Sequence, residues 1–208
     1  MTTFPTLRSA ALLISIAGFS VFAFTAVAQT PPAPKPLEVA RLTAKGDLQK
    51  PADLDSWVFL GTSLGMGYNP GSFNAANPGQ FQVVLMEPTA YQQFVKSGAY
   101  APGSMFLLAF YNADTQERSI NQHGFTQADL TNYEIHVITP KAGPERHAFY
   151  LFGADAAEGK PLPPNNNCQR CHLDHGAFDG TFAQFYPSIR PRIPKEALEK
   201  AGNDHDIR

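Results

Sequence analysis

The chain has 208 residues, of which 43% are hydrophobic and 16% are charged, and its formal net charge is −2. This balance is typical of a single globular domain. Because lysine and arginine form no cluster, the composition argues against nucleic acid or an anionic membrane as a partner. A small molecule or another protein is expected instead.

The first 28 residues are expected to form a secretion signal. Arg8 supplies a short basic region, residues 10–24 are an apolar run, and Ala26-Val27-Ala28 fits the small-x-small rule for cleavage. Removal of residues 1–28 would place the mature protein in the periplasm. An uncleaved membrane anchor is the alternative, because the run is slightly long for a signal. Residues 29–37 are rich in proline and predict an extended tether.

Five apolar segments predict β-strands after this tether. Some are continuous apolar runs, whereas the fourth alternates apolar and polar side chains and would place His136 on its polar side. In the second, Phe81, Val83 and Leu85 share one face. The expected strands are residues 57–61, 81–87, 104–111, 133–137 and 147–152.

Proline and glycine mark the helices and connections. Pro88 begins a short helix with an apolar stripe, and Gly98 ends it. Residues 194–201 predict a terminal helix that Gly202 ends. The expected loops, turns and irregular segments are residues 62–79, 102–103, 112–122, 140–144 and 160–167. About five strands and two or three short helices favour an α+β domain with a mainly antiparallel β-sheet.

Both cysteines of the chain lie in one motif, Cys168-Gln169-Arg170-Cys171-His172. A Cys-x-x-Cys-His run is the attachment signature of a c-type haem. Cys168 and Cys171 lie about one turn apart, so both sulfurs can form thioethers with neighbouring vinyl groups, and the imidazole of His172 can reach the iron as an axial ligand. We therefore expect one covalently attached haem c per chain, near the C-terminus. Arg170 is a candidate partner for a haem propionate.

Two other kinds of site use the same side chains. Cys168 and Cys171 could form a redox-active pair, or these cysteines, His172 and His175 could bind zinc. The flanking sequence lacks the βαβ pattern that usually surrounds a redox pair, and zinc would need four ligands to converge within eight residues. The other histidines show no ligand spacing, and they are His123, His136, His147 and His205.

The order of several motifs resembles the cytochrome P-460 family, including its cytochrome c-prime-beta relatives. The similar segments are residues 57–65, 86–91, 102–105, 168–172 and 181–187. The resemblance covers residues 38–190, which leaves residues 191–208 as a C-terminal helix and tail. It implies a homodimeric, mostly antiparallel β protein with a histidine-bound c-type haem and an open distal face.

The same resemblance implies activity toward small nitrogen compounds. Some members of the family oxidise hydroxylamine, and others chiefly bind nitric oxide. In the enzymes a lysine is bonded to the macrocycle and a distal carboxylate helps to move protons. This chain departs from that pattern, because no lysine occurs between Lys96 and Lys141 and Lys96 is expected at the surface. Whether the protein is an enzyme therefore stays open.

Several residues are candidates for the surroundings of the haem. Phe59, Phe81 and Phe106 could form an apolar distal cap, although phenylalanine on a strand is more often plain core. Glu87 and Glu134 are the candidate catalytic carboxylates, although a strand glutamate usually faces solvent. The candidate sixth ligands are Met66, Met86 and Met105, and the resemblance to a family with an open site favours none of them.

Three functions follow from these expectations. The first is an exported haem enzyme that oxidises a small nitrogen compound, and the second is a non-catalytic protein that binds nitric oxide. The third is a periplasmic electron-transfer cytochrome, which needs an occupied sixth position on the iron. The expected partners are a small nitrogenous ligand or substrate, a periplasmic redox protein and a second copy of the chain, with no nucleic acid.

Overall fold

The computed structural model describes residues 36, 37, 39–67, 78–114 and 124–202. The expected signal, most of the tether, His123 and His205 lie outside the described residues. In the described part of the chain, no helix has the length and apolar character needed to span a membrane. Residues 32–208 form one structural unit, and the description below concerns that unit alone.

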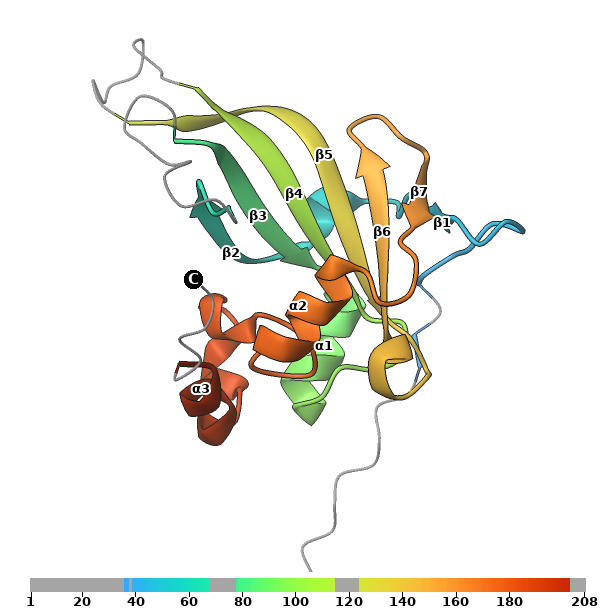
Figure 1. Cartoon of the computed structure of the whole chain (residues 1–208), viewed down its shortest axis with the longest axis vertical. Helices are drawn as coiled ribbons and strands as arrows, with labels where there is room; N and C mark the ends of the chain where they lie inside the picture. The colour runs from blue at the N-terminus through green and yellow to red at the C-terminus, as the bar shows by residue number, and fades with distance from the viewer. Residues whose placement is uncertain (1–35, 38, 68–77, 115–123, 203–208) are drawn as a thin grey trace, which may run out of the picture. The chain divides into compact units, whose positions relative to one another are not determined.

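Seven antiparallel strands form one sheet in the order β1-β7-β6-β5-β4-β3-β2 (Figure 1). From β2 to β7 each strand pairs with the next one in the sequence, and β1 pairs with β7. This arrangement confirms the predicted α+β class with a mainly antiparallel sheet. The strands are β1 Leu48–Gln49, β2 Val58–Leu64, β3 Gln80–Met86, β4 Met105–Asp114, β5 Thr126–Ile138, β6 His147–Gly153 and β7 Glu158–Pro161.

Three short α-helices accompany the sheet within the described residues. α1 begins at Pro88, with the Glu87 carboxylate accepting a hydrogen bond from the backbone N–H of Ala90 at 2.6 Å, and ends before Gly98, which has a left-handed φ of 69°. Both predicted ends of this helix are confirmed. The helices are α1 Pro88–Ser97, α2 Asn167–His175 and α3 Lys195–Gly202, and the 3-10 helices are η1 Leu54–Ser56, η2 Gly143–Arg146, η3 Ala183–Phe185 and η4 Arg190–Arg192.

One face of the sheet packs against the N-terminal segment. Alternate residues of β4 and β5, among them Leu107 and Ile135, join Leu48 and Trp57 in a buried cluster. Tyr133 and Phe152 stack in the same cluster, with ring centroids 4.6 Å apart. This face is therefore filled by the chain's own side chains.

The opposite face packs against the helices and the C-terminal segments. Its cluster joins Met86 and Phe106 of the sheet to Phe94 of α1 and to Ile189 and Ile193 near η4. In Figure 1 the three α-helices gather at this side, and α2 contacts β6. The second face thus carries both a core and the segment with the Cys-x-x-Cys-His motif.

The strands differ from the prediction in extent and number. Residues 62–64, expected in a loop, continue β2, and β5 begins at Thr126. The short strands β1 and β7 were not predicted. β7 includes Lys160-Pro161, the start of a segment that was expected to be irregular. Residues 112–114, expected in a loop, continue β4. Residues 68–77 and 115–122, which belong to two expected loops, lie outside the described residues.

Candidate functional site

The Cys-x-x-Cys-His motif forms most of α2. The helix begins after Asn166, whose side chain accepts a hydrogen bond from the backbone N–H of Gln169 at 2.9 Å. This is the usual role of asparagine at a helix N-cap. Cys168 and Cys171 are free thiols, each half-buried, and their three-residue spacing puts them on one face of the helix. His172 follows on the next position of the same helix.

A cavity of about 420 Å³ lies between α2 and the sheet. This volume is within the usual range for ligand sites of proteins. Both cysteines and His172 line it, together with aromatic and aliphatic side chains from the strands and from the segment after α2. The apolar lining includes Val84, Phe106, Leu108, Phe110, Phe149, Phe182 and Phe185.

The imidazole of His172 is fixed on several sides. Its Nδ1–H donates a hydrogen bond to the carbonyl oxygen of Gly180, with a distance of 2.7 Å. The rings of Phe182, Phe149 and His136 approach it with centroid distances of 4.6, 4.8 and 5.1 Å. Burial lowers the pKa of His172 to about 4, so the ring is neutral at pH 7. Nε2 is therefore the nitrogen left with a free lone pair.

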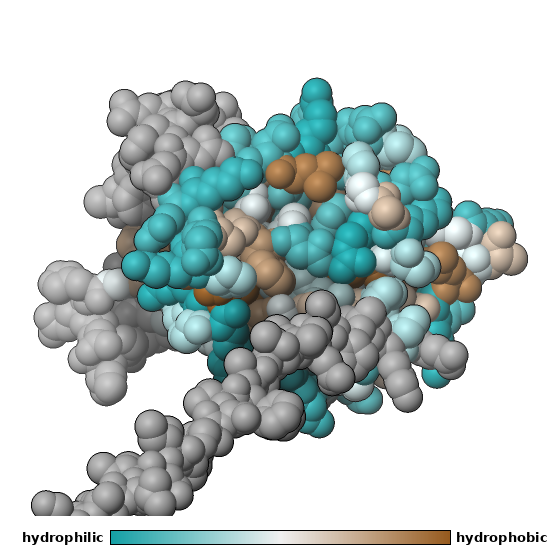
Figure 2. All heavy atoms as spheres, turned by 90° about the horizontal axis from the view of Figure 1, so that it is seen from below, coloured by the Kyte–Doolittle hydropathy of each residue, from teal (hydrophilic) through white to brown (hydrophobic). Residues whose placement is uncertain are grey.

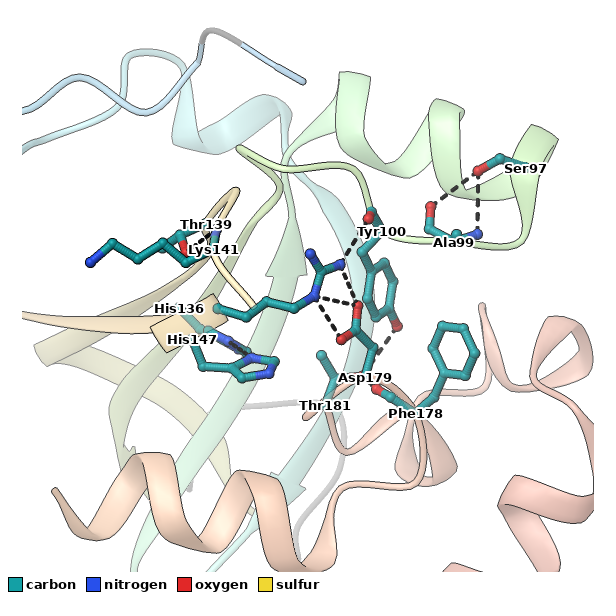
Figure 3. Close-up of polar contacts among 11 residues, drawn as sticks. Ser97, Ala99, Tyr100, His136, Thr139, Lys141, His147, Phe178, Asp179 and Thr181 are labelled. Carbon is teal, nitrogen blue, oxygen red and sulfur yellow. Dashed lines mark hydrogen bonds and ion pairs between the residues drawn. The ribbon is translucent and has the colours of Figure 1, made fainter. Parts of the chain in front are cut away.

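Two further histidines lie next to His172. Nε2 of His136 and Nδ1 of His147 share a hydrogen bond of 3.0 Å, which Figure 3 shows at the start of β6. His136 stacks on Phe149 at 4.4 Å and is only 5% exposed, and burial lowers the pKa of both histidines. As expected, His136 lies on the same face of β5 as Glu134, opposite Ile135. That face is not the solvent-exposed side expected of a half-buried strand, because α2 and the segment after it cover His136.

The surroundings of the cysteines bear on the two alternative sites. Burial raises the pKa of both thiols, and the nearby Glu134 carboxylate adds to the effect at Cys168. Redox-active pairs show the opposite, since the attacking cysteine has a lowered pKa. No three His, Cys, Asp or Glu side chains converge as a metal site anywhere in the described chain, so the zinc alternative has no support.

The structure brings some of the predicted residues into the cavity. Cys168, Cys171, His172, Phe106 and Glu134 all line it, and so does Met66. Phe106 and Glu134 reach it because each lies on the strand face opposite the N-terminal core. Burial raises the pKa of Glu134. The cavity lining contains no lysine among the described residues, and Lys96 is exposed on α1, as expected.

The other predicted residues lie away from the cavity lining. Phe81 and Phe59 belong to the opposite sheet face, since Phe59 pairs with Leu85, and Phe59 is 54% exposed. Glu87 caps α1 and is buried there. Among the remaining candidates, Met86 and Met105 are buried in the two core clusters, and Arg170 hydrogen-bonds Asn167 on the exposed side of α2.

Several residues of the site were missed by the sequence analysis. Gln169, inside the motif, is buried, and its Nε2 donates to the carbonyl oxygens of Pro144 and His147 at 2.7 and 3.1 Å. Arg146 and Asp179 form an ion pair beside the loop that carries Gly180. These contacts join segments far apart in the sequence, so no local pattern could have indicated them.

The arrangement fits a c-type haem. Two thiols on one helix face and an imidazole with a free Nε2 open into one apolar cavity, and these are the groups that such a cofactor uses. The face shown in Figure 2 is mostly hydrophilic, with apolar side chains in small separate patches, so the apolar lining of the cavity contrasts with this face.

Comparison with known proteins agrees with this geometry. No curated protein matches the chain. The family described as Cytochrome P460 matches residues 51–183, which include the strands β2 to β7, the cavity-lining segments on them and the whole Cys-x-x-Cys-His motif. This match covers well over half of the 208 residues. The chain therefore belongs to the cytochrome P460 family and is a haem cytochrome.

Proposed function

We propose that the protein is an exported mono-haem c-type cytochrome that binds a small nitrogen ligand such as nitric oxide. Cys168 and Cys171 hold the haem through thioethers, and Nε2 of His172 binds the iron. The single observation that supports this most is the cavity, in which both thiols and the imidazole face apolar strand residues. When bound, the haem supplies an iron that takes up a diatomic ligand or exchanges an electron.

The protein's own side chains define what enters the cavity. Phe106, Leu108 and Phe149 exclude water and favour a small, weakly polar molecule. His172 is held in one tautomer by Gly180, which keeps its Nε2 available as a ligand. The lining includes Met66, but 56% of this side chain is exposed, which favours an open sixth position over a Met ligand.

A second candidate function is oxidation of hydroxylamine, and Glu134 favours it. Its carboxyl group lines the cavity, and burial raises its pKa, so it can accept and release a proton closer to neutral pH than an ordinary glutamate. No lysine is among the described residues that line the cavity, and because a lysine cross-link is what the resemblance implies for the enzymes, this counts against hydroxylamine oxidation. Catalysis and simple binding therefore share one site.

Expression with c-type haem maturation tests the proposal. We expect haem staining of a denaturing gel, a high-spin spectrum in the reduced protein, and binding of nitric oxide. The Cys168→Ser/Cys171→Ser variant should lose covalent haem, whereas Arg170→Gln, on the exposed side of the same helix, should keep it. Absence of covalent haem from the unmodified protein overturns the proposal, and a low-spin reduced form that resists nitric oxide favours electron transfer. Steady-state turnover of hydroxylamine separates the enzyme from the binding protein.

Export and dimerisation belong to the same proposal. The basic, apolar and small-residue regions of residues 1–28 support export to the periplasm, and N-terminal sequencing of the secreted protein should find Gln29 first. Family membership supports a homodimer, which light scattering of the purified protein measures. A periplasmic redox protein is the proposed electron partner.

A further inference from the structure

The hydrogen bond of His172 depends on a tight turn. Its acceptor is the Gly180 carbonyl oxygen, and both Asp179 and Gly180 have left-handed backbones, with φ angles of 42° and 61°. Asp-Gly with a left-handed φ at both residues is a preferred sequence for a two-residue hairpin turn, and the N–H of Thr181 donates to the carbonyl oxygen of Phe178 at 2.9 Å to close it. A Cβ at residue 180 would lie 2.5 Å from the His147 ring, so the loop also packs closely against β6. The turn's own hydrogen bonds fix its shape, so contacts outside the turn must hold its position beside α2.

An ion pair provides that hold. Nη2 and Nε of Arg146 donate to the two carboxylate oxygens of Asp179 at 2.7 and 2.9 Å, and Nη2 also donates to the Tyr100 carbonyl oxygen at 3.1 Å. The pair is largely buried, and the hydrogen bond with Asp179 raises the pKa of Arg146. Such a bidentate pair fixes direction as well as distance.

The segment that carries Arg146 also holds α2. η2 ends at Arg146, and the Gln169 side chain on α2 donates to the carbonyl oxygens of Pro144 and His147 on either side of this end. One turn therefore anchors both the helix that bears His172 and the loop that bears its hydrogen-bond acceptor. The relative position of Nδ1 and the Gly180 oxygen is set from this turn.

We propose that the Arg146–Asp179 pair is a positioning device for His172, which sets the strength of the hydrogen bond from Nδ1–H to Gly180. The inference rests on the proposed function, in which Nε2 of His172 binds the haem iron. A strong hydrogen bond at Nδ1 makes the imidazole a stronger donor at Nε2, which stabilises the ferric state. Loosening the loop should then weaken the iron–histidine bond and raise the reduction potential.

The rival explanation is that the two charges act on the iron only through space. The two explanations predict opposite signs for loss of Arg146 and the same sign for loss of Asp179. Loss of the Arg146 cation alone would lower the potential by electrostatics, and loss of the Asp179 anion alone would raise it. Loss of positioning raises the potential in both cases. Arg146→Lys keeps the charge but not the bidentate geometry, so through-space electrostatics predicts no change for it.

The experiment measures the reduction potential and the iron–histidine stretching frequency of haem-loaded variants. We expect Arg146→Lys, Arg146→Met and Asp179→Asn all to raise the potential and lower the stretching frequency. A tenfold change in the reduction equilibrium, which is typical for a group behind a metal ligand, corresponds to about 59 mV. Glu145→Gln is the matched control, because it removes the exposed Lys141–Glu145 pair of the same turn.

The outcomes separate this inference from the proposed function. A lower potential in Arg146→Met, or an unchanged stretching frequency in Arg146→Lys, overturns the positioning role while haem binding stands. A shift in Glu145→Gln as large as that in Arg146→Lys also overturns it. If the unmodified protein shows no iron–histidine stretch at all, the proposed function fails first. Should Arg146→Met not fold, Arg146→Lys decides the matter alone.

Discussion

The two glutamates singled out in the sequence have different surroundings, and replacing each should have a different effect. In Glu87→Ala, α1 loses the carboxylate that accepts from Ala90 at 2.6 Å. Loss of a helix N-cap costs about 0.5–2 kcal/mol, and this buried, charged cap should fall between about 1 and 2. For a domain of this size 1 kcal/mol shifts Tm by about 2–4 °C, so we expect a fall of about 2–8 °C. Nitric oxide affinity should not change.

Glu134→Gln should keep the stability of the protein and change the pH dependence of ligand binding. Burial raises the pKa of Glu134 in the folded protein above its value in the unfolded chain. The protonated carboxyl group therefore contributes to stability fully at a pH below the unfolded-state pKa, and this contribution is lost as the pH rises through the folded-state pKa. At neutral pH the glutamine variant should therefore be at least as stable as the unmodified protein, and the advantage should vanish at low pH. Because Glu134 lines the cavity, the variant should also lose the pH dependence of nitric oxide binding or hydroxylamine turnover.

Thermal unfolding followed by circular dichroism, and nitric oxide titration between pH 4 and pH 8, measure both effects on one protein preparation. Glu87→Gln is a matched control, since it removes the charge of the cap and keeps most of its size. The reasoning is refuted if Glu87→Ala changes nitric oxide affinity at constant haem content. It is refuted as well if Glu134→Gln has the same pH profile as the unmodified protein.

Three further predictions follow from contacts around the two sheet faces. The neutral, buried His136 should contribute a fall in the free energy of unfolding as pH drops below about 6.5, by up to about 1.4 kcal/mol per pH unit. In urea titrations His136→Phe should reduce the slope by this contribution and leave the part due to His147 and His172, whose pKa values are also lowered. Tyr100→Phe should lower the free energy of unfolding by about 1 kcal/mol, because it removes a buried hydrogen bond with Thr181 while the Thr181 hydroxyl keeps its bond to the Phe178 carbonyl oxygen. A larger loss in urea unfolding would contradict this. Phe152→Ala should cost about 3–5 kcal/mol in the same assay but leave the haem spectrum unchanged, since Phe152 packs on the face away from the cavity.

Local signals accounted for the parts of the fold that could be predicted. Pro88 and Gly98 gave both ends of α1, because one suits the first helical turn and the other takes a left-handed backbone. β7 had no such signal, since it is short, contains a proline and pairs at the side of a sheet already formed. Glu87 was assigned to the end of a strand although Pro88 already marked the helix start, because glutamate is not among the residues that usually cap a helix.

The site, like the fold, could be predicted only where local sequence carried the signal. Cys168, Cys171 and His172 carry their signal in five consecutive residues, and the structure places them around one cavity. His136 was assigned to a polar strand face because apolar and polar residues alternate along this strand. Alternation shows which side chains share a face, but it does not show whether that face meets water. From Tyr133 onward β5 is covered on both sides, so its alternation there separates an apolar core from the cavity.

The sequential pairing of the strands has a consequence for biogenesis. Because β2 to β7 each pair with their neighbour in the chain, the main sheet closes through short-range contacts, which form quickly. Both cysteines follow the last of these strands, so the wall that receives the cofactor can assemble before the attachment helix reaches it. Apoprotein waiting for its haem would then be a partly folded species with an exposed apolar wall, and the supply of haem would govern how much of it escapes aggregation or proteolysis.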